Sequence, residues 1–214
     1  MPRRFALPLC LAGLAALPLQ AAAQSRAVAP VFGQVVAFDV AAPFGPLAAF
    51  ENATADSYIL EFVPAGDTLE VWSQMLTLTG ARGLVGAATT GAEAQALARQ
   101  FGDALGRGYS AACPETLHAE TFEVAAIAGA RAVFGAYLGC GTVVGTDHSE
   151  AVVFLVLVGA SDIYTLQWAE RGPAEAVAPV AAADPWAMRA GVLAATQLCT
   201  PPAGEAAPYP SCTR

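Results

Sequence analysis

The chain has 214 residues, of which 56% are hydrophobic and 13% are charged, and its formal net charge is −8. This length suits one domain, and the hydrophobic content excludes an intrinsically disordered chain, because disorder requires low hydrophobicity and high net charge. The acidic balance argues against nucleic-acid binding, which needs clustered positive charge on the protein.

The N-terminus has the layout of a secretory signal peptide. Arg3 and Arg4 precede an apolar run at residues 5–19, and a small-x-small site follows at residues 21–23. The run is shorter than the roughly 20 residues that a membrane helix needs, and no second long apolar stretch follows. We therefore expect a signal peptide over residues 1–23, no integral membrane segment after its removal, and a soluble protein that is periplasmic or extracellular.

The next segment, residues 24–50, is rich in Ala, Pro and Gly. It holds one expected strand around residues 35–40, and residues 41–47 have the composition of a linker. A single α+β domain is then expected over residues 51–200, followed by a Pro-rich C-terminal tail at residues 201–214.

The first half of this domain contains two expected strands and one long helix. The strands lie at residues 58–63 and 74–79, separated by a turn and a short helical turn at residues 68–72. The helix spans residues 90–108, because apolar residues recur at helical spacing and Thr90 with Glu93 forms a capping-box pattern. Two glycines near residue 108 are expected to end it.

The second half contains two expected hairpins and a final helix. The first hairpin joins strands at residues 118–127 and 131–140 through a tight turn, and the second joins strands at residues 150–158 and 163–168. The helix begins with Asp-Pro at residue 184 and runs to about residue 198. This order predicts an α+β fold with one antiparallel sheet of about five to six strands packed against two main helices.

Removal of Cys10 with the signal peptide leaves four cysteines, and an even number in an exported chain indicates disulfides. Three pairings are possible. Spacing favours Cys113 with Cys140, which bracket an expected hairpin, and Cys199 with Cys212, which close the C-terminal tail. The alternative is a metal site, but no Cys-x-x-Cys occurs, and the sequence predicts neither a metal nor another cofactor.

Residues 58–199 carry an ordered set of short motifs. They are EFVPAG at 61–66, Trp72, Met75, Thr77, Cys113-Pro114, Cys140, Gly145 with Glu150, Tyr164, Ala169 with Arg171, and Cys199. This set resembles a family of exported proteobacterial proteins of unknown function, which usually has Pro after the second cysteine where this chain has Gly141. The element order is also similar to the Mog1/PsbP-like fold, a sheet between helices. The resemblance implies no activity, cofactor or catalytic residue.

An acidic and aromatic cluster lies within this pattern. Glu61, Asp67 and Glu70 are close in sequence to Trp72. One interpretation is a surface that contacts a cationic ligand or partner through charge and the ring face. The other, which we favour, is that Trp72 fills the core while the acids are solvated. Trp72, Glu61 and Glu70 are nevertheless the best candidates for a ligand or partner contact.

Two other groups contain residue types that are common in catalytic sites. His118 and Glu120 lie two apart on an expected strand and so share a face, where Glu115 or Glu123 could complete a metal or acid–base site. Two ligands are too few for a tight metal site, which favours a solvated polar stripe. Residues 147–149 read Asp-His-Ser, but a catalytic triad needs these types from distant chain segments.

The scarcity of candidate catalytic residues predicts a non-enzymatic periplasmic binding or interaction protein of unknown ligand, with no catalytic residue assigned. Two alternatives stay open. One is a periplasmic enzyme that uses a His and carboxylate site. The other is an envelope-associated accessory protein, whose partner would be another envelope protein.

Overall fold

The computed structural model describes residues 25–179 and 184–213, so the expected signal peptide at residues 1–23 lies outside the described residues. In chain order the elements are β1 (Ser25–Val31), β2 (Gln34–Val40), β3 (Phe50–Ala53), β4 (Ser57–Phe62), β5 (Gln74–Ala81), α1 (Gly91–Ala112), β6 (Leu117–Phe122), β7 (Ala132–Cys140), β8 (His148–Val158), β9 (Ile163–Pro173), α2 (Asp184–Ala194) and β10 (Gln197–Cys199). Among these described elements, no helix has the length and apolar character needed to cross a bilayer.

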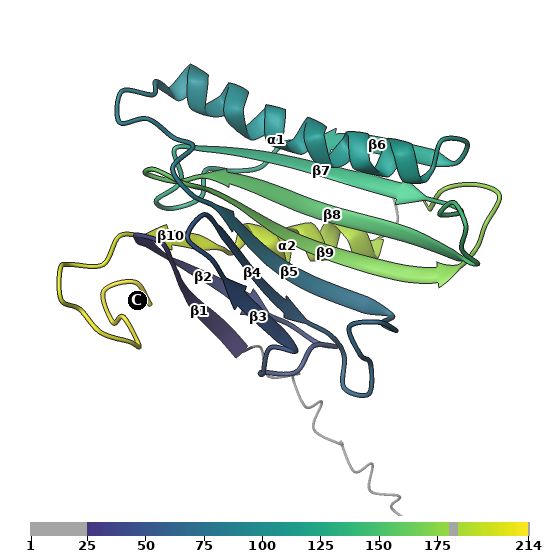
Figure 1. Cartoon of the computed structure of the whole chain (residues 1–214), viewed down its shortest axis with the longest axis horizontal. Helices are drawn as coiled ribbons and strands as arrows, with labels where there is room; N and C mark the ends of the chain where they lie inside the picture. The colour runs from purple at the N-terminus through teal and green to yellow at the C-terminus, as the bar shows by residue number, and fades with distance from the viewer. Residues whose placement is uncertain (1–24, 180–183, 214) are drawn as a thin grey trace, which may run out of the picture.

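The strands form two antiparallel sheets. Seven strands pair in the order β3-β4-β5-β9-β8-β7-β6, and three pair in the order β1-β2-β10. Helix α1 covers one face of the larger sheet, while α2 and the smaller sheet lie on the other side (Figure 1). The α+β class is confirmed, but the expectation of a single sheet of five to six strands is wrong.

Strand β8 explains the layering, because both of its faces are buried. Val152, Phe154 and Val156 point toward α1, while the alternate residues Val153 and Leu155 enter the core shared with α2 and the small sheet. An apolar run of this kind is typical of a strand that has a covering layer on each side. The two cores therefore meet at β8.

The N-terminal segment contains more strand than expected. Residues 25–40 form a hairpin of β1 and β2, in which Ser25 pairs with Val40 and Val31 pairs with Gln34. The buried Gln34 side chain accepts a hydrogen bond from the backbone N–H of Ala160 at 2.8 Å, which ties this hairpin to the turn between β8 and β9. The composition of β1 did not predict a strand, because its Ala and Pro residues have low strand propensity.

Helix α1 begins as expected and ends later. Thr90 caps it, and the reciprocal hydrogen bonds with Glu93 complete a capping box. The helix continues through Gly106 and Gly108 to Ala112, because its last turns are held against the sheet by side-chain contacts and a disulfide. Tertiary packing here outweighs the low helix propensity of glycine.

Three other local expectations are wrong. Residues 68–72 form bends and no helix. Strand β6 ends at Phe122, and a wide loop places Ile127 in the core in place of a tight hairpin. Helix α2 ends at Ala194, and the residues after it form β10, which pairs with β2. Long-range contacts decide the second and third conformations, whereas hydrogen bonds of Asp67 with Ser73 close the loop at residues 68–72.

The two favoured cysteine pairings are present. Cys113, directly after α1, is bonded to Cys140 at the end of β7, and their Cα atoms lie 5.7 Å apart. Cys199 of β10 is bonded to Cys212 in the C-terminal tail, with a Cα separation of 5.5 Å. The first disulfide thus fixes the end of α1 to the sheet, and the second folds the tail back on the small sheet.

The first disulfide closes a loop with a sequence separation of 27 residues. The double substitution Cys113→Ala with Cys140→Ala should lower the free energy of unfolding by about 3.5 kcal/mol, because the unfolded chain regains loop entropy. Urea unfolding measures this change. The matched variant Cys199→Ala with Cys212→Ala opens a loop with a separation of 13 residues and should cost slightly less. Wild-type stability in both double variants would contradict the expectation.

Two glycines of α1 provide an internally controlled test of helix packing. A Cβ on Gly102 would overlap the buried ring of Phe134, whereas a Cβ on Gly106 would meet nothing within 4 Å. Gly102→Ala should therefore destabilise the protein by about 1–3 kcal/mol through overpacking. Gly106→Ala should stabilise it by about 0.5–1 kcal/mol through helix propensity. Thermal unfolding compares the two, and equal effects would show that α1 does not pack as described.

Candidate functional site

An open cleft of about 500 Å³ lies at one end of the large sheet. The β4–β5 loop forms one side of it through Glu70 and Trp72, and the start of β8 and end of β9 form the other through His148 and Arg171. We call it the Trp72 cleft. Two of the three candidate contact residues, Trp72 and Glu70, therefore meet in one cavity.

Asp67 builds the loop that carries Trp72. Its carboxylate accepts hydrogen bonds from the backbone N–H of Ser73 at 2.6 Å and from the Ser73 hydroxyl at 2.7 Å. These two hydrogen bonds stabilise the charged form and lower the pKa of Asp67. Asp67, at the start of the loop, thus binds Ser73 at its end and holds the loop closed. Its carboxylate therefore has a structural role in this loop.

Trp72 lies half-buried at the surface and does not fill the core. The Arg171 guanidinium lies over its ring, 3.8 Å from the ring centroid. The backbone of the loop is also attached to β9, since the N–H of Arg171 donates to the carbonyl of Ser73 at 2.9 Å. One ring face is therefore covered by a cation, and this contact fixes how the indole is presented in the cleft.

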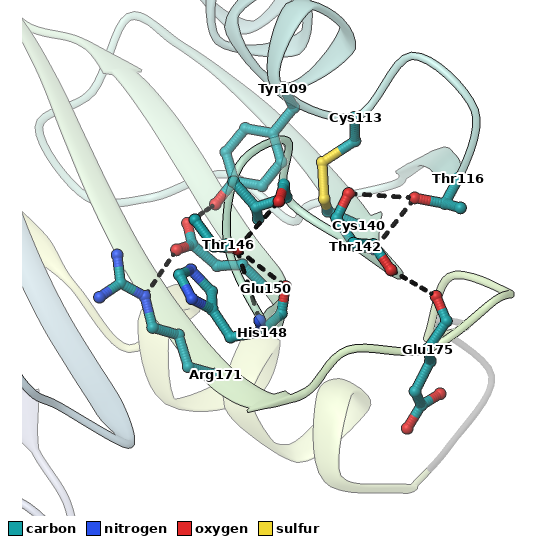
Figure 2. The surroundings of a disulfide bond; sticks show 11 residues. Tyr109, Cys113, Thr116, Cys140, Thr142, Thr146, His148, Glu150, Arg171 and Glu175 are labelled. Carbon is teal, nitrogen blue, oxygen red and sulfur yellow. Dashed lines mark hydrogen bonds and ion pairs between the residues drawn. A yellow bond between two sulfur atoms is a disulfide. The ribbon is translucent and has the colours of Figure 1, made fainter.

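The Arg171 charge is balanced from behind by a network that reaches α1. Arg171 Nε donates to Glu150 Oε2 at 2.9 Å, and the Tyr109 hydroxyl donates to Glu150 Oε1 at 2.7 Å (Figure 2). Burial raises the pKa of Tyr109, and the negative charge of Glu150 raises it further. Both oxygens of the Glu150 carboxylate therefore accept a hydrogen bond. Through this carboxylate, α1 is connected to β8 and β9, and through Arg171 to the β4–β5 loop that carries Trp72.

Two other carboxylates of the cleft have no such partner. The side chains of Glu70 and Asp147 are exposed and line the cavity. Within the described residues, neither carboxylate makes a hydrogen bond or an ion pair. Because Glu150 already neutralises Arg171, the cleft keeps a negative charge beside an aromatic ring, which suits a cationic group.

Glu61, the third candidate contact residue, lies elsewhere. It is half-buried on β4, opposite Thr77 of β5, and does not line the Trp72 cleft. Burial raises the pKa of its carboxyl group. Nearness in sequence was misleading here, because a strand carries Glu61 away from the loop that carries Trp72.

The two histidines lie on opposite faces of the large sheet. His118 faces the α2 side and forms a hydrogen bond with Glu120, with 2.5 Å between His118 Nε2 and Glu120 Oε1. His148 lines the Trp72 cleft on the α1 side. Among the described residues, neither Glu115 nor Glu123 bonds to the first pair, and no cluster of three potential metal ligands is found.

The Asp-His-Ser sequence at 147–149 does not form a triad. Successive strand residues point to opposite faces, so Ser149 is buried while His148 is in the cleft.

No protein-family model and no curated protein sequence matches this chain. The resemblance to an exported proteobacterial family, stated above from short motifs, therefore stays a prediction. Sequence reasoning assigned no role in the cleft to Tyr109 or Glu150. Glu150 entered only as one residue of the motif set at 58–199, and Tyr109 had no signal beyond its place near the end of a helix. Many structural residues share these patterns.

Tyr109 provides a test of the network through pH. The pKa of Tyr109 is raised in the folded protein well above the ordinary tyrosine value of about 10, so its stabilising contribution is complete below about pH 10 and is lost as pH rises further. Tyr109→Phe should destabilise the protein by about 1–2 kcal/mol at pH 8, because the bond to the Glu150 carboxylate is lost. Urea unfolding between pH 8 and pH 11 should show the gap from wild type narrowing at about pH 10 and above. A gap that stays constant would exclude the raised pKa.

Proposed function

We propose that this protein is an exported, non-enzymatic binding protein that uses the Trp72 cleft to hold a basic segment of an envelope partner protein. The observation that carries the proposal is the half-exposed Trp72 ring between Glu70 and Asp147, two carboxylates without a partner among the described residues. Export is supported by the expected signal peptide and by the two disulfides.

The shape of the cleft favours a protein segment over a small molecule. The cavity is open, and its carboxylates lie on different segments, Glu70 on the β4–β5 loop and Asp147 before β8. An extended chain with Arg or Lys side chains can reach both groups. Exposed ion pairs contribute under about 1 kcal/mol each and a cation over an indole about 0.5–2 kcal/mol, so binding requires several such contacts together.

The alternative of an active site that uses both histidines is not favoured, because His118 and His148 lie on opposite faces of the large sheet. Of the two, His148 alone lines the Trp72 cleft. The second alternative, an envelope-associated accessory protein, is compatible with a partner segment in the Trp72 cleft and differs from our proposal only in the partner's role.

The proposal is tested with a capped peptide in which Arg alternates with Ala, compared with the same peptide carrying neutral citrulline. Calorimetry should detect the Arg peptide alone, with an affinity that falls as salt is added. Glu70→Gln should weaken binding about three- to fivefold, and Trp72→Ala about tenfold.

The control is Glu175→Gln, which removes an exposed carboxylate outside the cleft and should bind like the wild type. Circular dichroism of each variant verifies the fold. Equal binding of the Arg and citrulline peptides, or unchanged binding by Trp72→Ala, would refute the proposal.

A further inference from the structure

A second cavity lies on the other face of the large sheet, between α2 and the edge strand β6. Its volume is about 350 Å³. Helix α2 packs mainly over β8 and β9, and the cavity lies between this helix and β6. The apolar wall consists of Phe122, Tyr137, Val153, Trp186, Ala187 and Ala190. We call this cavity the α2 pocket.

The aromatic walls are fixed in place by neighbouring groups. The rings of Tyr137 and Trp186 pack edge to face with centroids 5.0 Å apart, and the Tyr137 hydroxyl donates to the carbonyl of Pro179 at 2.6 Å. The buried Arg189 guanidinium lies 4.3 Å from the Trp186 ring centroid and forms an ion pair with Glu170. The pocket is therefore preformed, which lowers the entropic cost of binding.

One charged group stands at the edge of this apolar surface. Among the described residues that line the pocket, Glu120 alone is charged, and its side chain is 48% exposed. His118 Nε2 bonds to Glu120 Oε1, while the second oxygen has no partner in the described part of the chain. His118 thus orients the carboxylate and leaves one oxygen available at the mouth of the pocket.

We propose that the α2 pocket binds a small organic amine whose apolar or aromatic body fills the cavity and whose ammonium group pairs with Glu120. The cavity is within the range of small-molecule sites, which are mostly apolar with a few placed polar groups. A carboxylate beside aromatic rings selects a cation, and it repels a carboxylate or phosphate ligand. This site is on the opposite face from the Trp72 cleft and does not depend on the function proposed for that cleft.

The first experiment uses three probes of similar shape and different charge. These are 2-phenylethylamine, 2-phenylethanol and 3-phenylpropionate, titrated into the uniformly ¹⁵N-labelled protein. At millimolar ligand we expect the amine to shift the indole N–H resonance of Trp186 and to bind about tenfold more tightly than the alcohol. The anion should not bind. Absence of amine binding, or equal affinity for amine and alcohol, would overturn the proposal.

The second experiment locates the site with variants. Glu120→Gln should weaken amine binding about tenfold without changing alcohol binding, while Glu123→Gln, an exposed carboxylate outside the pocket, should have no effect. Ala187→Leu adds volume at an exposed helix position and should abolish binding of both probes.

Trp72→Ala should bind the amine like the wild type, so failure of one site is distinguishable from failure of the other. Thermal unfolding verifies that each variant is folded. An amine affinity that is unchanged in Glu120→Gln, or lost in Trp72→Ala, would overturn the assignment to the α2 pocket.

Discussion

The burial of β8 on both faces is the constraint on which the rest of the structure depends. The side chains on the face of β8 that carries Phe154 need an apolar layer over them, and the side chains on the opposite face, which carries Leu155, need a second one. A strand of this kind is stable only between two layers. Helix α1 supplies one layer, and α2 with the β1–β2–β10 sheet supplies the second. The order of the layers thus follows from one apolar run in the middle of the chain.

The same constraint explains why the candidate sites are at the periphery of the sheet. Helix α2 packs mainly on β8 and β9 and leaves an open cavity beside the edge strand β6 on its side of the sheet, and the Trp72 cleft lies where β8 begins and β9 ends. Each of these regions has an aromatic side chain beside a carboxylate with at least one oxygen that has no partner among the described residues. These pairs are Trp72 with Glu70, and Trp186 with Glu120, whose other oxygen bonds to His118. In a chain with a formal charge of −8, both sites favour positively charged ligands. The Trp72 cleft is open and suits a protein segment, whereas the α2 pocket is more enclosed and suits a small molecule.

The sequence predicted features whose cause is local. The Thr90 capping box, the turn after β4 and the hairpin of β8 and β9 depend on residues close together in the chain. The favoured disulfide pairings also followed from short spacing. Long-range contacts were not predictable in this way: β1 exists because it pairs with β2, and β10 exists because it pairs with β2 from the far end of the chain. The candidate site was half predicted, since Trp72 and Glu70 share a loop whereas Glu61 lies on a strand that leads away.

By itself, the sequence determined the α+β class, the positions of the central strands and the cysteine pairing, because periodicity, turn residues and loop closure act over short distances. It did not determine every strand end, since β9 continues to Pro173 and not only to residue 168. The tertiary structure alone decided which side chains meet. Tyr109, Glu150 and Arg171 come from a helix and two strands, and their network forms only when α1 packs on the sheet. His118 and His148 are separated for the same reason, since the register of β6, β7 and β8 places them on opposite faces. Side-chain convergence depends on packing between distant segments, and a single sequence carries no direct record of it.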